Sequence, residues 1–275
     1  MDFLGVTFKN LTKFINVSFE LAKFLHCIFE DITVFKRRET FSPDKNEVVI
    51  FNFVNFKNPQ NTTFMDFPLS KISFLMTDVK DITIIAKAEE ILSEKLLRYK
   101  EKEERGKINE TNKNENFEKV IKILRPYLRQ ETVLAEYRNI RKSFEKNRTF
   151  VEASELFIKE MELLKKGLPW FEKAVYDFYY GLSKYGESII RPIFWSAVFI
   201  FVYPLIILFL NYNNDFSKVT EFYPKCLKET LRAFFQLGII DKSSLMISYE
   251  WSIRIISLIL LSNLFIAIKR RLERV

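Results

Sequence analysis

The sequence predicts an α+β protein of three successive parts: a small β-helix in residues 1–86, a helical region in residues 87–185 and a two-helix transmembrane domain in residues 186–275. Three observations lead to this prediction. Apolar residues recur every five positions near the N-terminus, good helix formers of mixed charge fill the middle, and two long stretches almost free of charge lie near the C-terminus.

The β-helix is predicted from the spacing of five. Apolar residues follow it first in residues 12–35, at Phe14, Phe19, Phe24, Phe29 and Val34, and again in residues 62–84, at Phe64, Leu69, Phe74, Val79 and Ile84. A period of five fits neither a helix nor a strand, so the backbone must turn a corner every five residues. Such a chain forms a solenoid whose axis is filled by stacked side chains. An ordinary β-sheet domain is the alternative.

The residues between the two runs break this spacing. It falls there on Glu39, Asp44 and Pro59, which do not suit an apolar core. We therefore expect residues 37–47 to leave the solenoid and residues 48–56 to return to it as a strand. Whether all of residues 37–59 continue the β-helix or loop out stays open at this stage.

The five-residue pattern resembles that of the pentapeptide-repeat family, with a second residue of the pattern two positions before each Phe or Leu. The residues at these earlier positions are Thr12, Val17, Ala22, Cys27 and Ile32, then Thr62, Phe67, Ile72, Thr77 and Ile82. The resemblance implies a right-handed, four-sided β-helix, whose surface could bind a protein partner. Residues 1–86 carry ten basic and ten acidic side chains, and a nucleic-acid partner or mimic needs a dominant field of one sign, so we expect no nucleic acid.

The middle part predicts helices, with a loop in residues 105–116 and an antiparallel hairpin of helices in residues 133–146 and 150–165. The hairpin is similar to a segment that joins pentapeptide repeats to a membrane domain in a group of bacterial and archaeal proteins. The matching residues are Tyr137, Arg138, Arg141, Ala153, Phe157, Glu160 and Met161. Helix packing with Arg–Glu pairs explains them as well as a ligand site does.

The two apolar stretches, residues 189–212 and 251–268, are long enough to cross a bilayer. Lys and Arg lie before the first stretch and after the second, which predicts that both termini are cytoplasmic in an integral membrane protein. Arg254, Ser257, Ser262 and Asn263 interrupt the second stretch. Polar side chains within a membrane-spanning helix face other helices of a bundle or line a water-filled path, so Ser257, Ser262 and Asn263 are candidate pore-lining residues.

The segment that leads into the first stretch is similar to a Y-G-x-S-x-x-R-P sequence of the same group of proteins. Tyr185, Gly186, Ser188, Arg191 and Pro192 match it. Gly186 could break the chain between a cytosolic and a membrane helix, with Pro192 in the first turn of the span. The resemblance implies the bacterial cytoplasmic membrane as the location.

The residues between the spans predict a short helix that begins at Pro224 and ends at Gly238. A short helix and a glycine turn between two spans resemble the pore helix and filter of two-span potassium channels, whose filter reads T-x-G-Y-G-D. The six residues aligned with that filter are Gln236, Leu237, Gly238, Ile239, Ile240 and Asp241. Only Gly238 and Asp241 agree with it. By analogy, the resemblance implies a homo-oligomeric pore, a tetramer, with a degenerate filter that could pass a monovalent cation.

We expect neither enzymatic catalysis nor metal or cofactor binding. The chain has one histidine, His26, and two cysteines, Cys27 and Cys226, and it lacks a glycine-rich phosphate loop, so we expect no catalytic residue, metal or cofactor. The expected function is therefore an ion-channel-like pore regulated by a cytosolic solenoid. A membrane-anchored scaffold for protein interactions, without conduction, is the alternative.

Overall fold

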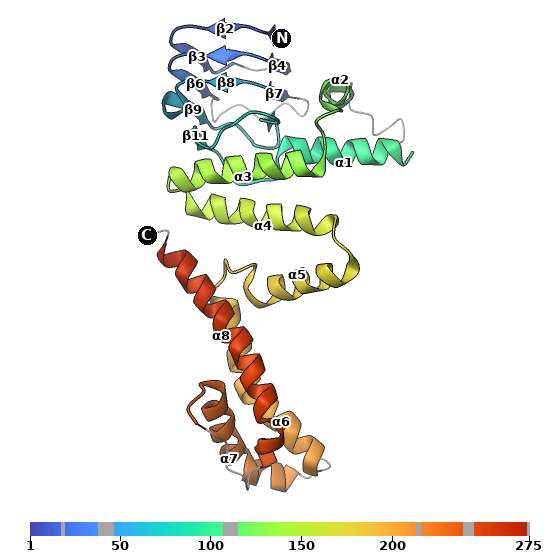
Figure 1. Ribbon diagram of the computed structural model, residues 1–275, viewed down its shortest axis with the longest axis vertical. Coiled ribbons are helices and arrows are strands. Elements are labelled where there is room, and N and C mark those ends of the chain that lie inside the picture. The colour runs from blue at the N-terminus through green and yellow to red at the C-terminus, as the bar shows by residue number, and fades with distance from the viewer. Residues whose placement is uncertain (18–19, 38–46, 107–114, 213–215, 239–244, 274–275) are drawn as a thin grey trace. The chain divides into compact units, whose positions relative to one another are not determined.

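The computed structural model describes the whole chain except residues 18–19, 38–46, 107–114, 213–215, 239–244 and 274–275 (Figure 1). The chain forms two compact units, Met1–Leu168 and Pro169–Val275, and each has its own hydrophobic core. The first unit holds the solenoid and helices α1 to α4, and the second holds α5 to α8. The helical region expected in residues 87–185 is thus divided between the two units.

The first unit begins with a β-solenoid, as predicted. Its strands pair only in parallel, and the chain visits three sheets in turn, which makes three coils and the start of a fourth. The first sheet contains β1 (Asp2–Leu4), β4 (Leu21–Leu25), β7 (Val48–Asn52) and β10 (Ile72–Ser73). The second contains β2 (Thr7–Phe8), β5 (Ile28–Phe29) and β8 (Asn55–Phe56). The third contains β3 (Thr12–Ile15), β6 (Thr33–Lys36), β9 (Thr62–Met65) and β11 (Thr83–Ile85).

The spacing of five describes the last coils better than the first. In residues 62–84, all ten positions of the pattern are buried. In the first run, however, Ile32 is exposed and the neighbouring Thr33 and Phe35 are buried instead. Phe8 pairs with Phe29, 21 residues later, whereas four sides of five residues would give 20. The extra residue shifts the buried positions by one, so the strict five-residue register across the first run was wrong.

Three columns of phenylalanine rings fill the solenoid. Within a column, successive ring centroids are 4.5 to 5.5 Å apart and the rings are nearly parallel. Rings of neighbouring columns meet edge to face, as Phe35 and Phe51 do at 84°. Both arrangements suit the quadrupole of an aromatic ring. The columns are Phe3–Phe24–Phe51–Phe74, Phe8–Phe29–Phe56 and Phe14–Phe35–Phe64.

A buried ion pair marks the place where the chain leaves and rejoins the solenoid. Arg37 Nη2 lies 2.7 Å from Glu47 Oε2, and both side chains are at most 9% exposed. The nine residues between them lie outside the described part of the chain. Strand β7 follows Glu47 directly, which confirms that the chain returns as a strand there.

Helices cover the last coil of the solenoid (Figure 1). They are α1 (Leu92–Glu104), α2 (Glu115–Leu124), α3 (Gln130–Lys146) and α4 (Phe150–Lys166). The backbone N–H of Leu92 donates to the carbonyl of Leu69 at 2.9 Å, and the Ser143 hydroxyl donates to the carbonyl of Ile82 at 2.5 Å. These contacts occupy backbone groups that an open strand edge would leave unpaired.

The second unit consists of helices alone in its described part. They are α5 (Trp170–Ser183), α6 (Ile190–Tyr212), α7 (Phe216–Phe234), the short 3-10 helix η3 (Leu245–Tyr249) and α8 (Glu250–Leu272). Helix α7 returns along α6, because Phe222 stacks on Tyr212 at 5.4 Å and Phe234 lies 6.1 Å from Phe199. Pro224 lies inside α7, so the prediction that the helix begins there was wrong.

Candidate functional site

Helix α6 and the segment Met246–Leu272 are long and apolar enough to cross a membrane. A core helix of a water-soluble protein meets the same criteria of length and composition. Here, however, only 22% of each apolar window is buried within the chain. Large side chains on both helices are more than half exposed, among them Ile190, Phe194, Leu210, Trp251, Leu258 and Phe265. An apolar surface of this extent normally faces lipid or another protein.

The first half of the expected filter lies against α8. Arg254 of α8 donates from Nη1 to Gln236 Oε1 at 2.6 Å and from Nη2 to the carbonyl oxygen of Gly238. Gln236 in turn donates to the hydroxyl of Ser257 at 3.1 Å. Gln236 and Gly238 both have positive φ, 57° and 130°. The turn after α7 is therefore fixed to the start of α8 by side chains, while Leu237 is 73% exposed.

Charge at this turn is balanced within one helix. Glu250 Oε1 lies 2.6 Å from Arg254 Nη2, in the i, i+4 arrangement, and both side chains are at most 20% exposed. A filter of the potassium-channel kind offers free carbonyl oxygens to a cation. At Gly238 the carbonyl accepts from a guanidinium instead. Ile239, Ile240 and Asp241 lie outside the described residues.

The candidate pore-lining residues do not share one face of α8. Ser257 is fully buried and its hydroxyl also donates to the carbonyl of Arg254 at 2.8 Å. Ser262 is exposed. Asn263 accepts from the Ser183 hydroxyl of α5 at 3.0 Å. Because 100° separates successive helical residues, positions 257, 262 and 263 point in different directions.

The segment that leads into α6 forms a tight corner between α5, α6 and α8. Tyr185 is fully buried among the tyrosine rings of α5, and its carbonyl accepts from Arg270 Nη1 at 2.6 Å. Arg270 also pairs with Glu187 at 3.1 Å. Gly186 has a φ of +81°, and a Cβ there would lie 3.0 Å from Ile266 Cγ2 and from the Tyr179 hydroxyl. The glycine thus serves both the turn and the close approach of α8.

The other matched residues of this corner begin α6. The Ser188 hydroxyl accepts from the N–H of Arg191 at 3.4 Å, and Pro192 lies in the first turn, where a missing N–H costs nothing. Arg191 donates from Nη1 to the carbonyl of Tyr180 at 2.8 Å and lies over its ring at 5.1 Å. All five residues of the motif are therefore brought together, and they hold helices in place.

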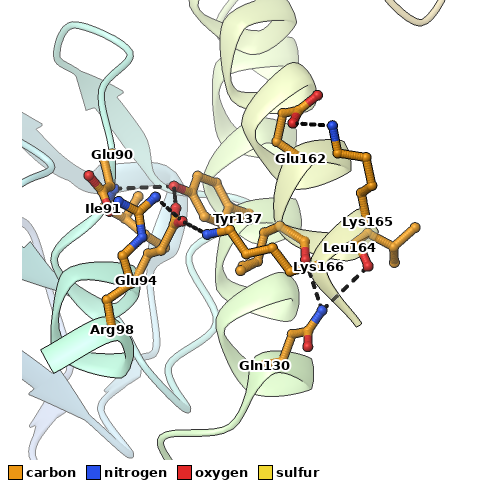
Figure 2. A network of polar contacts seen from close by, with 11 residues as sticks. Glu90, Ile91, Glu94, Arg98, Gln130, Tyr137, Glu162, Leu164, Lys165 and Lys166 are labelled. Carbon is orange, nitrogen blue, oxygen red and sulfur yellow. Dashed lines mark hydrogen bonds and ion pairs between the residues drawn. The ribbon is translucent and has the colours of Figure 1, made fainter. Parts of the chain in front are cut away.

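The first unit contains a second polar cluster, which joins α1, α3 and α4 (Figure 2). Glu94 accepts from Tyr137 at 2.6 Å, from Lys166 at 2.8 Å and from Arg98 at 2.6 Å. Burial acts to raise the pKa of Glu94, but these three hydrogen bonds outweigh it and hold the pKa below its usual range. Burial and then Glu94 itself raise the pKa of Tyr137. Since each of these four side chains donates or accepts within the chain, the cluster holds the three helices together.

The predicted hairpin of helices is confirmed in α3 and α4. Glu160 is buried and pairs with Arg138 at 2.7 Å and with Arg141 at 3.3 Å, while Arg141 lies over the Phe157 ring at 5.4 Å. These residues thus pack two helices together. This agrees with the interpretation as helix packing with Arg–Glu pairs, which the sequence supported as well as a ligand site. Within the described residues, no three His, Cys, Asp or Glu side chains gather to hold a metal ion.

Sequence reasoning missed the parts played by Glu250, Arg254 and Arg270. In the sequence, Arg254 stands out only as an interruption of the apolar stretch. A Glu and an Arg four residues apart at the start of that stretch could have indicated an ion pair, because such a pair shares a helix face. The contacts of Arg254 with Gln236 and Gly238 join residues 18 and 16 positions apart, and no local pattern in the sequence indicates them.

Comparison with known proteins identifies a sequence relative that is itself uncharacterized. The chain is 39% identical over 240 residues to the uncharacterized protein MJ1147 of Methanocaldococcus jannaschii, a match that covers 82% of this chain and 50% of that protein. The chain thus spans about half the length of the relative. No family model matches the sequence, and no solved structure matches it.

Proposed function

We propose that the chain is an integral membrane protein whose second unit forms an oligomeric, channel-like pore, regulated by the solenoid unit on the cytosolic side. Membrane insertion is supported by the exposed apolar faces of α6 and α8. Lys269, Arg270 and Arg271 at the end of α8 favour the cytosolic side for this end of the helix, and with two spans the proposal has the residues before α6 on the same side.

The single observation that carries the pore proposal is the position of α7 between the two spans. This helix packs against both α6 and α8, and the turn at its end, residues 236–238, rests on the second span through Arg254. A helix that returns along two spans and ends in a turn against the second is the arrangement that a pore helix and its filter would have. Because two spans do not enclose a pore, several copies must assemble, and a tetramer is the arrangement expected by analogy.

The filter in this proposal is degenerate. The Gly238 carbonyl accepts from Arg254, whose charge is balanced by Glu250, so this carbonyl is not free to coordinate a cation. We therefore expect weak selectivity, with a monovalent cation as the permeant species. Binding of a protein partner to the solenoid would shift the balance between closed and open states of the pore.

Current through planar bilayers tests the proposal. Gly238→Ala places a Cβ at a φ of +130°, which an L-residue rarely adopts, although no atom lies within 4 Å of that Cβ. We expect unitary current from the unaltered protein and an altered or abolished current from Gly238→Ala. Gly181→Ala is the matched control, because this helical glycine also has open space around it. Absence of current from well-folded protein under all conditions contradicts the pore.

A membrane-anchored scaffold is the second candidate. The Glu250–Arg254 pair and its contacts to the turn favour it, because they use polar groups that a conducting pore would leave for ions. In this case the chain ending before residue 189 would still capture the partner of the solenoid and restore function in cells. A truncated chain that binds its partner but restores nothing favours the pore.

A further inference from the structure

The first coil of the solenoid, which β1, β2 and β3 form, leaves its aromatic core open on one side. Figure 1 shows this coil at the end of its unit away from α1 and α3, which close the other end. Its inward rings are partly exposed, whereas the rings that follow them in the second coil are at most 1% exposed. The open rings are those of Phe3, Phe8 and Phe14, and the covered ones are those of Phe24, Phe29 and Phe35.

The strands of the first coil also present backbone groups to this open end. In the described chain, β1, β2 and β3 each lie at the edge of a sheet and pair with one neighbouring strand. The N–H groups of Thr12 and Asn16 donate to carbonyls of the second coil, both at 2.9 Å. Because successive residues of a strand direct these groups to opposite sides, those of Lys13 and Ile15 point to the open end. Such an edge is a template for another strand.

The outer surface of the first coil is more apolar than that of the later coils. Among the described residues of the solenoid, seven large apolar side chains are exposed, and four of them belong to the first coil: Met1, Leu4, Leu11 and Ile15. The terminal coil of a repeat protein normally has a polar outer face, which keeps it soluble. The first coil is therefore built like an inner coil that another coil continues.

We propose that the first coil pairs end to end with the first coil of a second copy, about a two-fold axis perpendicular to the solenoid. Strands of the two copies run antiparallel across this contact, and the three columns of phenylalanine rings continue from one copy into the other. An added peptide strand would cover one sheet edge and leave the rings of the other columns open, whereas a complete coil covers all three.

A second copy supplies such a coil, and a two-fold contact closes with two copies, so it does not extend into a filament. The charged side chains of the first coil are exposed around its rim and stay in water in this arrangement: Asp2, Lys9 and Lys13. The inference goes beyond the proposed function and requires neither conduction nor membrane insertion. It joins copies in pairs through their first units and leaves the sides of the solenoid free for a protein partner.

Distances between spin labels test this contact in the full-length protein, purified in detergent. Cys27→Ala with Cys226→Ser removes both native thiols, and a label is then attached through Lys13→Cys, Val34→Cys or Thr63→Cys. The three positions follow one another in register on the outer face of successive coils. Since neighbouring strands lie about 4.8 Å apart, each step away from the contact adds roughly 10 Å to the separation of two labels along the solenoid axis.

We expect a narrow distribution of distances at each position and a mean distance that rises from residue 13 to residue 34 and again to residue 63. Leu11→Lys in the Val34→Cys protein should weaken the association roughly tenfold, because it adds a cation to each side of the contact. The dilution at which half of the paired spins are lost measures this change. Ile32→Lys is the matched control, because Ile32 occupies the position of Leu11 one coil further from the contact, and it should change nothing.

Four results would overturn the proposal. Distances that do not rise along the three positions indicate that the copies meet elsewhere, for example through their second units. No spin–spin coupling, with mobile labels at all three positions, indicates that the first coil stays open. No coupling, with an immobile label at residue 13 alone, indicates that something other than a second copy covers the coil. Equal weakening by Leu11→Lys and Ile32→Lys places the contact away from the first coil. None of these results bears on the pore, which the bilayer currents test separately.

Discussion

The hydroxyl of Ser183 donates a hydrogen bond to Oδ1 of Asn263, 3.0 Å away, and so links the end of α5 to the middle of α8. The same hydroxyl accepts from the N–H of Gly186 at 3.0 Å. The amide nitrogen of Asn263 donates to the carbonyl of Ile259 at 2.8 Å. Asn263 therefore uses both ends of its amide within the chain, which favours a role in helix packing over the lining of a pore.

The first prediction concerns this link. Asn263→Ala should lower the stability of the detergent-solubilised protein by about 0.5–1.5 kcal/mol, because an interhelical hydrogen bond is lost. Thermal unfolding followed by tryptophan fluorescence measures the change, since all three tryptophans lie in the second unit. The adjacent and exposed Ser262 supplies the control Ser262→Ala, which should leave the midpoint unchanged. Equal effects of the two variants would contradict the packing role.

The second prediction concerns the charge at the turn after α7. Arg254→Gln removes the cation beside the Gly238 carbonyl and leaves Glu250 unpaired. If residues 236–241 line a permeation path, cations should become more permeant relative to anions, because the local charge changes from balanced to negative. The reversal potential in a KCl gradient reports this ratio. Arg254→Lys keeps the charge and should keep the ratio; an unchanged ratio in Arg254→Gln places the path elsewhere.

Much of the solenoid could be predicted from the sequence, because each coil repeats the same pattern of buried residues. Residues such as Phe64, Phe74 and Ile84 are spaced by the repeat itself and all lie in the core. The extra residue before Thr33 was not visible, because Ile32, Thr33 and Val34 are all compatible with a core position. The pairings of Phe8 with Phe29 and of Phe14 with Phe35, each 21 residues apart, reveal the shift.

The second unit was less open to prediction, because its contacts join distant segments. Pro224 suggested a helix start, as proline is favoured in the first turn. Helix α7 nevertheless contains it, and Val219, five residues earlier, is buried in the same core. The apolar residues of 216–223 could have extended the predicted helix. The pairing of Arg270 with Glu187 and Tyr185 spans more than 80 residues, and the sequence carries no local signal for it.

The third prediction concerns Glu136 of α3, which is 2% exposed beneath the last coil. Its Oε1 accepts from the N–H of Phe74 at 2.5 Å, and burial raises its pKa from 4.5 to about 7. The folded state therefore binds more protons than the unfolded state between these pH values, so stability should fall as pH rises through that window. Glu136→Gln stays neutral and should remove this contribution, which is of the order of 3 kcal/mol or less.

Labelling of Cys27 measures stability in the first unit. Cys27 is fully buried in the solenoid, and Cys226→Ser leaves it as the only thiol. In this background, the urea midpoint for labelling by a disulfide reagent should decline from about pH 5 to about pH 7.5 when Glu136 is present, and it should decline less in the Glu136→Gln variant. Parallel declines in the two proteins would mean that Glu136 titrates near its ordinary value.

The fourth prediction concerns Tyr137, whose hydroxyl donates to Glu94 at 2.6 Å and accepts from the N–H of Ile91 at 3.4 Å (Figure 2). Tyr137→Phe keeps the ring but takes a hydrogen bond from a buried carboxylate, so the free energy of unfolding should fall by about 1–3 kcal/mol. Tyr127→Phe is the control, because the Tyr127 hydroxyl has no hydrogen-bond partner among the described residues, and its urea midpoint should not change.

The pH dependence separates this effect from a simple packing defect. Because the pKa of Glu94 is lowered in the folded state, its stabilising contribution is complete above the ordinary value of 4.5 and is lost as the pH falls through the lowered pKa. Tyr137→Phe removes one of the hydrogen bonds that lower this pKa, so the contribution should shrink and acid unfolding should begin at a higher pH than in the unaltered protein. The Cys27 labelling midpoint, followed from neutral to acid pH, reports both changes. A variant that is weaker at neutral pH but keeps the acid transition of the unaltered protein would show that the Tyr137 hydroxyl serves packing alone and does not stabilise the Glu94 carboxylate.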